Sequence, residues 1–355
     1  MSCQHPPIGS EQQFGEVTLV VEELSVAAHD PSLFESCLDR SYAPCPVIAS
    51  EYDIPTHLEA LHLTGNRIST ISNIPDLPNL STLVLRQNLI SKIENISHLV
   101  SVTELDFYEN QIQILEGMDE LVNLQMLDVS FNQIQKIQNL SFPELRNLFL
   151  VKNQISKIEN LDNLQSLANI ELSDNKISKI ENLNNLQNLQ ALWLANNQIQ
   201  IIENLDSLSN LSILSLANNR ISTVTGLETV GRNLEELYLS MNGISNLIGI
   251  YPCCNSLRIL DLSMNKLTSV KGVSKFRHLE ELWLNDNQIS DWKELREELG
   301  PMTSLETVYL CRNPVAMDKM YRVKLLLCQP SLLQIDVVPV MENLKKLAET
   351  CPIVF

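Results

Sequence analysis

The apolar residues of the chain follow one pattern that repeats along most of its length. In the first copy, Leu61 and Leu63 stand two residues apart, Asn66 follows three positions later, and Ile68 two positions after that. Apolar residues at alternate positions are typical of a β-strand with one buried side. The pattern returns about every 22 residues and predicts twelve short strands. The asparagines of the twelve copies are Asn66, Asn88, Asn110, Asn132, Asn153, Asn175, Asn197, Asn219, Asn242, Asn265, Asn287 and Asn313.

Each copy also predicts how the chain turns back toward the next strand. An Asn side chain can bond backbone groups that have left the strand ladder, which explains a polar residue where an apolar one is expected. After it, apolar residues recur every three positions, as in Ile90, Ile93 and Ile96, the spacing of tight 3₁₀ or short helical turns. Strands take less room than the turns behind them, so the stack should curve. We therefore expect an α/β solenoid: a leucine-rich-repeat horseshoe of about twelve 22-residue repeats, with a parallel concave sheet, a 3₁₀ or short helical convex side and a carboxy-terminal cap.

The pattern fails at both ends of the chain, and this sets the expected boundaries. Residues 1–55 lack it and are expected to be mostly disordered, with some part folding over the first repeat as a cap. Residues 56–315 are the leucine-rich repeats. Residues 316–355 are expected to form a carboxy-terminal cap and a short helical tail, because an open end of the stack would expose leucines to water.

Between the two core positions of each copy lies one residue that points away from the core by the two-residue period. Five of these residues are aromatic and four are acidic, although aromatic residues make up only 5% of the chain. Trp and Tyr are favoured at the centre of protein interfaces, and a nearby carboxylate selects a Lys or Arg of the partner. We interpret them as a protein-binding face rather than a solubilising one. They are His62, Val84, Asp106, Asp128, Phe149, Glu171, Trp193, Ser215, Tyr238, Asp261, Trp283 and Tyr309.

The net charge indicates which classes of partner are disfavoured, and the cysteines indicate the cellular compartment. The net charge of −18 repels phosphate backbones and anionic lipid surfaces, which argues against a nucleic acid or a membrane as partner. No leader-like segment opens the sequence, so neither secretion nor a membrane span is expected. The eight cysteines are scattered without zinc-ligand spacing. We expect reduced thiols inside the cell and no metal site.

The sequence also lacks the common motifs of catalysis. It contains no Gly-rich phosphate loop, no His-Glu-x-x-His and no Gly-x-Ser-x-Gly. The outward carboxylates could in principle form an acid/base pair, but a wide solvated sheet should leave their pKa values nearly ordinary. We therefore expect a non-enzymatic protein without a cofactor.

Several segments are more specific than the generic repeat. Through these segments the chain resembles the leucine-rich-repeat regulatory subunit of protein phosphatase 1, of the regulatory subunit 7 type. The resemblance covers about residues 58–338. The segments are Lys-Ile-Glu-Asn at 92–95, 157–160 and 179–182, Leu-Asp-Val-Ser-Phe-Asn at 127–132, Leu-Trp-Leu-Asn-Asp-Asn at 282–287, and Ser-Leu-Glu-Thr-Val-Tyr-Leu at 304–310 followed by Arg312, Asn313 and Pro314.

The resemblance implies one partner, the phosphatase catalytic subunit, held in the hollow of the horseshoe. The family binds it with acidic and aromatic residues. All matching positions keep the expected type except Trp193, where the family pattern resembles Phe. The positions are Asp128, Phe149, Glu171, Trp193, Asp261, Glu281, Trp283 and Tyr309.

The resemblance further implies control of the assembly, localisation or activity of the phosphatase. It also implies a role in mitotic chromosome segregation, a distribution between nucleus and cytoplasm, and a ternary complex with a small phosphatase inhibitor protein. Two other functions stay open on the residues alone. A ribonucleoprotein scaffold uses similar repeats but would favour basic patches, and an adaptor of a ciliary or microtubule complex uses the same repeat.

Overall fold

A computed structural model describes residues 36–42, 54–250 and 254–350 of the chain. The remaining residues, which include most of the segment for which disorder or an amino-terminal cap was predicted, lie outside the described part. The described residues fall into two compact units that divide between Lys176 and Ile177. Each unit is a stack of repeats, and the boundaries predicted at 55 and 315 stay predictions.

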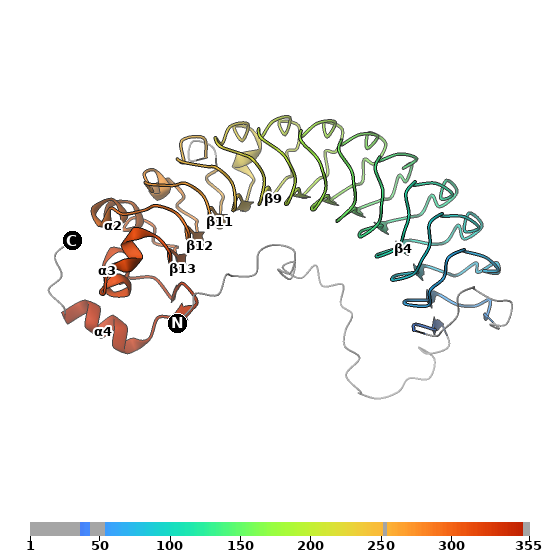
Figure 1. Cartoon of the computed structure of the whole chain (residues 1–355), viewed down its shortest axis with the longest axis horizontal. Helices are drawn as coiled ribbons and strands as arrows, with labels where there is room; N and C mark the ends of the chain where they lie inside the picture. The colour runs from blue at the N-terminus through green and yellow to red at the C-terminus, as the bar shows by residue number, and fades with distance from the viewer. Residues whose placement is uncertain (1–35, 43–53, 251–253, 351–355) are drawn as a thin grey trace. The chain divides into compact units, whose positions relative to one another are not determined.

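The first unit holds seven three-residue strands that pair in chain order, all parallel (Figure 1). Residues at the same place in neighbouring repeats are directly paired, so Leu105 lies beside Leu127 and Asp106 beside Asp128. The strands are β1 (Cys37–Asp39), β2 (Ala60–His62), β3 (Thr82–Val84), β4 (Glu104–Asp106), β5 (Met126–Asp128), β6 (Asn147–Phe149) and β7 (Asn169–Glu171).

The second unit continues the same design and adds the helices of the carboxy-terminal cap. Its strands also pair in chain order, and only β15 runs antiparallel to its neighbour. The strands are β8 (Ala191–Trp193), β9 (Ile213–Ser215), β10 (Glu236–Tyr238), β11 (Ile259–Asp261), β12 (Glu281–Trp283), β13 (Thr307–Tyr309), β14 (Gln334–Ile335) and β15 (Val338–Pro339). The helices are η1 (Val230–Arg232), η2 (Val273–Lys275), η3 (Pro314–Met317), α2 (Trp292–Leu299), α3 (Tyr321–Cys328) and α4 (Glu342–Thr350).

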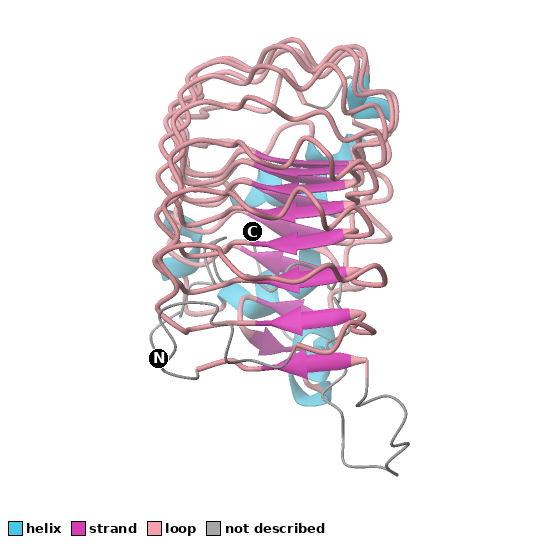
Figure 2. Ribbon diagram, turned by 90° about the vertical axis from the view of Figure 1, so that its right-hand side faces the viewer, coloured by secondary structure: helices cyan, strands magenta, loops and turns pink. Residues whose placement is uncertain are grey.

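The predicted fold class is confirmed: the chain is a β-solenoid of about twelve turns with a parallel sheet and few helices. Within each unit the strands (magenta in Figure 2) lie on one face and the turns on the other. The three-residue spacing behind the strands gives single 3₁₀-type bonds, such as Leu99 N–H to Ile96 O at 3.0 Å. Between described strands, only η1, η2, α2, η3 and α3 lengthen into helices.

The repeated asparagines hold neighbouring turns together through a ladder of buried hydrogen bonds. The Asn88 amide donates to the carbonyls of Leu63 and Leu85 at 2.9 and 3.0 Å. Its oxygen accepts the backbone N–H groups of Asn66 and Ile68 at 3.0 and 2.9 Å. The amide therefore replaces strand hydrogen bonds at the point where the chain leaves the sheet.

The carboxy-terminal cap closes this ladder with a different side chain. Asp336, which is 2% exposed, accepts the backbone N–H groups of Leu310 and Cys311 at 3.0 and 2.9 Å. Gln329 donates to the carbonyls of Leu299 and Met302, both at 2.8 Å. These bonds satisfy backbone groups that a further repeat would otherwise cover.

Candidate protein-binding face

The outward residue predicted in each repeat is the last residue of its three-residue strand. We call this row the strand stripe; it contains the twelve outward residues from His62 to Tyr309 named above. The middle residue of each of these twelve strands, such as Leu127 in β5, is fully buried. Glu281 stands apart from the stripe because it is the first residue of β12, two positions before Trp283 and on the same side of the strand.

In the first unit the structure brings Asp128, Phe149 and Glu171 onto three consecutive strands. Asp128 pairs with Phe149, and Phe149 with Glu171. The Asp128 carboxylate accepts the backbone N–H of Ser130 at 2.8 Å, and the Glu171 carboxylate accepts that of Ser173 at 3.0 Å. Each acid therefore also terminates its strand by bonding an N–H group two residues on.

The carboxylates of the stripe in the first unit are less exposed than the sequence predicted. Glu171 is 4% exposed and Asp106 is 7% exposed. Burial raises the pKa of Glu171 to about 7. Burial, with the adjacent Asp128 carboxylate as a second cause, raises the pKa of Asp106 to about 6. The expectation of nearly ordinary pKa values was wrong, because burial in the fold removes water from each carboxylate.

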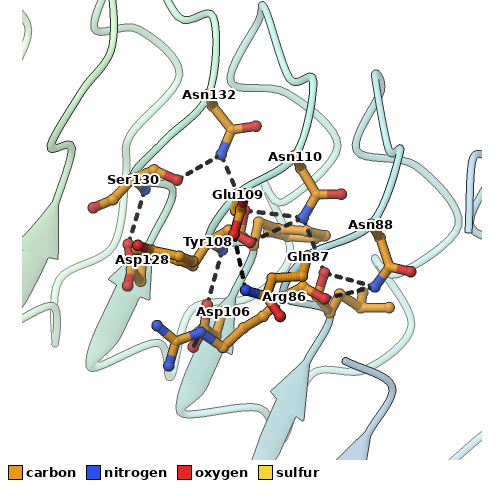
Figure 3. Close-up of polar contacts among 12 residues, drawn as sticks. Arg86, Gln87, Asn88, Asp106, Tyr108, Glu109, Asn110, Asp128, Ser130 and Asn132 are labelled. Atoms are coloured by element: carbon orange, nitrogen blue, oxygen red, sulfur yellow. Dashed lines mark hydrogen bonds and ion pairs between the residues drawn. The ribbon is translucent and has the colours of Figure 1, made fainter. Parts of the chain in front are cut away.

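Beside Asp106 lies a group of residues that come from the turns just after the strands (Figure 3). The Arg86 guanidinium lies 3.4 Å from the Asp106 carboxylate and 4.4 Å from the centre of the Tyr108 ring. The Tyr108 and Phe131 rings are 4.8 Å apart, and Phe131 remains 37% exposed. Tyr108 and Phe131 were not among the predicted site residues, because the direction of a side chain after a strand depends on the turn.

In the second unit four aromatic residues form two pairs along the stripe. The rings of Trp193 and Tyr238 stack at 5.9 Å. Ser215 on the strand between them is small enough to let the rings meet, and it is 4% exposed. Trp283 and Tyr309 meet edge to face at 5.3 Å. Tyr238 belongs to the stripe but not to the positions implied by the family resemblance. Its stacking on Trp193 was not predicted from the sequence.

The carboxylates of Glu281 and Asp261 lie next to these aromatic pairs but differ in their exposure. The Trp283 indole N–H donates to the Glu281 carboxylate at 3.2 Å. Asp261 lies in register between Tyr238 and Trp283 and is 5% exposed. It accepts the Ser263 backbone N–H at 2.9 Å and the Ser263 hydroxyl at 2.7 Å. Burial raises its pKa. Glu281 is therefore available to a partner, whereas Asp261 is recessed.

In the described ranges 36–42, 54–250 and 254–350, no three His, Cys, Asp or Glu side chains gather as a metal-ligand set. None of the helices found there is both long and apolar enough to cross a membrane.

The fold and its repeat define the class: the chain is a leucine-rich-repeat solenoid. The family described as "Leucine Rich repeats (2 copies)" matches residues 56–98 and 187–229. Two further leucine-rich-repeat families match residues 78–134 and 253–274.

The curated relatives carry the resemblance to phosphatase subunits over short stretches. The chain is 40% identical over 66 residues to "Protein phosphatase 1 regulatory subunit SDS22" of Schizosaccharomyces pombe, which is 18% of this chain and 20% of that protein. It is 50% identical over 48 residues to "Protein phosphatase 1 regulatory subunit 7" of Homo sapiens, which is 14% of this chain and 13% of that protein. The matches thus span a fifth or less of these relatives.

Solved structures show the same fold over most of the chain. An internalin (inlF) from Listeria monocytogenes matches with a TM-score of 0.67 and 25% identity, over 79% of this chain and 86% of that one. A leucine-rich-repeat protein of Leptospira interrogans matches with a TM-score of 0.62 and 23% identity, over 79% and 80%. The latter likeness shows the fold alone.

Proposed function

We propose that this chain is a non-enzymatic subunit that binds the catalytic subunit of protein phosphatase 1 through the strand stripe and Glu281. The names of the curated relatives support the choice of partner. The observation that carries the proposal is the Trp283–Tyr309 pair with the Glu281 carboxylate against the indole. Aromatic anchors of this kind dominate the binding energy of protein interfaces.

The geometry suggests how a basic surface of the phosphatase is recognised. A Lys or Arg of the partner places its aliphatic stem against the Trp283 ring and its charge against Glu281. The acids Asp128, Glu171 and Asp261 hold strand ends, and in their ionised form they supply negative potential along the face. That potential favours association with a cationic surface and weakens as salt increases.

A binding role accounts for the raised pKa of Glu171 better than an acid/base role. A pKa near 7 suits a general acid, but the Glu171 carboxylate bonds the backbone of its own strand end. Structural carboxylates in buried positions show the same shift as catalytic ones. The raised pKa of Glu171 is thus a consequence of its burial.

The proposal extends to cell biology on the strength of the resemblance. We place the protein in nucleus and cytoplasm, where it controls the assembly, localisation or activity of the phosphatase during chromosome segregation. A small phosphatase inhibitor joins the complex.

The proposal is tested by isolating the protein with its partners from cell extract and then titrating it with the purified catalytic subunit. We expect the phosphatase catalytic subunit in the isolate and saturable binding in the titration. An isolate that contains axonemal or spliceosomal proteins and no phosphatase, together with an absence of binding in the titration, would support the adaptor or scaffold alternatives instead.

A further inference from the structure

One segment of the second unit has a charge pattern that runs against the rest of the chain. Residues 262–279 contain three lysines, one arginine and one histidine, but no Asp or Glu. In the whole sequence, acidic residues outnumber basic ones by 43 to 25. Gathered like charges repel one another, so such a segment is stabilised when an anion lies among them.

Part of this segment surrounds a hollow at the surface of the second unit. The hollow has a volume of about 400 Å³ and is lined by Asn255, Lys275, Arg277 and His278, all of them exposed. Asn255 precedes β11, Lys275 ends η2, and Arg277 and His278 lie between η2 and β12. None of them belongs to the strand stripe. We call this feature the basic hollow.

The carboxylates near the basic hollow bond other groups. The Glu280 carboxylate accepts two hydrogen bonds from the Arg258 guanidinium, at 3.0 and 2.9 Å. Glu294 accepts the Ser269 hydroxyl and the Val270 N–H at 2.9 and 2.6 Å. Glu298 accepts the Ser274 N–H at 3.1 Å.

The cations of the hollow have no such counter-charge. In the part of the chain that the structure describes, the two cations Lys275 and Arg277 form no ion pair within 4.0 Å. Their charges are therefore left for a ligand.

We propose that the basic hollow binds a phosphate group. A guanidinium offers two parallel donors to one face of a phosphate, an ammonium adds a point charge, and an Asn amide adds neutral donors. Arg277, Lys275 and Asn255 provide this combination around one space. Two positive charges match a phosphate dianion better than a single carboxylate. The site is separate from the face assigned to the phosphatase and does not depend on that assignment.

The test is calorimetric titration of the full chain at an ionic strength held constant with NaCl. The probes are inorganic phosphate, a phosphoserine peptide and the same peptide without its phosphate. We expect wild-type protein to bind a phosphate-bearing probe and Arg277→Glu to weaken that binding by about tenfold or more, since a charge-assisted contact becomes a repulsion. Lys136→Glu is the matched control, because Lys136 is exposed in the first unit, and it should leave the affinity unchanged.

The outcomes separate the two sources of phosphate. Binding of both phosphate-bearing probes indicates a phosphorylated partner, and binding of inorganic phosphate alone indicates the free ion. No binding of either by wild-type protein, equal binding of the unphosphorylated peptide, or equal affinities of wild type and Arg277→Glu would each overturn the proposal. If Arg277→Glu changes the melting temperature, Arg277→Gln replaces it, because Gln removes the charge with less disturbance.

Discussion

At the residue scale, the acidic side chains of the stripe have a structural role in addition to the binding role proposed for them. Asp128, Glu171 and Asp261 each accept a backbone N–H two residues on, where strand pairing stops. Replacing one of them by Ala would leave a buried donor without a partner. A loss of binding in such a variant would therefore mix a structural effect with a lost contact. Trp283 and Glu281 are cleaner probes because they are not buried.

Trp283→Ala should weaken binding of the phosphatase catalytic subunit by well over tenfold. Removal of a central aromatic anchor commonly costs about 2 kcal/mol or more. The variant should keep the circular-dichroism spectrum and melting curve of the wild type, because Trp283 is a half-buried surface residue and the core residue of that strand is Leu282. Titration of the purified catalytic subunit measures the change, and equal affinities would remove Trp283 from the binding face.

Glu281→Ala should cause a smaller loss, and the loss should shrink as salt is raised. Glu281 is a half-buried carboxylate at the start of β12, so its interaction with a cation of the partner is partly screened. Association rates of wild type and variant at low and high NaCl test this. A loss that is independent of salt would assign Glu281 to holding the Trp283 indole rather than to attracting the partner.

Substitution of the core residue Leu194 should affect the stability of the fold, in contrast to substitution of Trp283 or Glu281. Leu194 is fully buried and directly follows β8, so truncation leaves a cavity in the core. Leu194→Ala should lower the free energy of unfolding by roughly 2 to 5 kcal/mol. Chemical denaturation measures it. An unchanged midpoint would show that the repeats collapse around the missing side chain.

At the element scale, the asparagine ladder joins each strand-and-turn unit to the next. Asn110 donates to the carbonyls of Leu85 and Phe107 at 2.9 and 3.0 Å and accepts the Ile90 N–H at 3.0 Å. Asn110→Ala leaves these buried backbone groups without partners, at about 1 to 3 kcal/mol for each group that water does not reach. We expect a loss of several kcal/mol in denaturation experiments.

The exposed Asn79, which is not part of the ladder, supplies the control for this variant. Asn79→Ala should be nearly neutral. If the two variants were equally stable, the ladder bonds would contribute no net stability beyond those that water provides.

At the scale of the whole molecule, the buried acids should make stability depend on pH. The folded-state pKa of Glu171, about 7, lies above the ordinary value of 4.5. Between these values the unfolded chain gives up the proton while the folded chain keeps it, so this group lowers stability as pH rises from about 4.5 to 7. Asp106 acts in the same direction up to about pH 6.

Glu171→Gln isolates this effect, because Gln can still accept the Ser173 N–H and carries no charge. We expect the variant to gain melting temperature relative to wild type at pH 7.5 and to lose that advantage near pH 5. Thermal melts at several pH values measure the difference. A constant difference across this range would show that Glu171 titrates normally in the folded protein.

Much of the molecule could be predicted because repeats turn local rules into global structure. The spacing of Leu61, Leu63 and Asn66 fixes a strand and a turn, and copies of one unit can bury their leucines only by stacking. The sequence alone also identified the stripe, since alternate residues of a strand point to opposite sides.

Other features depend on neighbours that are distant in the sequence, and only the tertiary structure decided them. The stack of Trp193 on Tyr238 requires the small Ser215 on the strand between them. Glu171 and Asp261 are buried in the folded stack, which removes water from them and raises their pKa values. The sequence by itself determined the fold and the side of each strand that faces outward, because these depend on local periods. Exposure, ring pairing and ionisation depend on the distances between strands, and therefore on the folded stack.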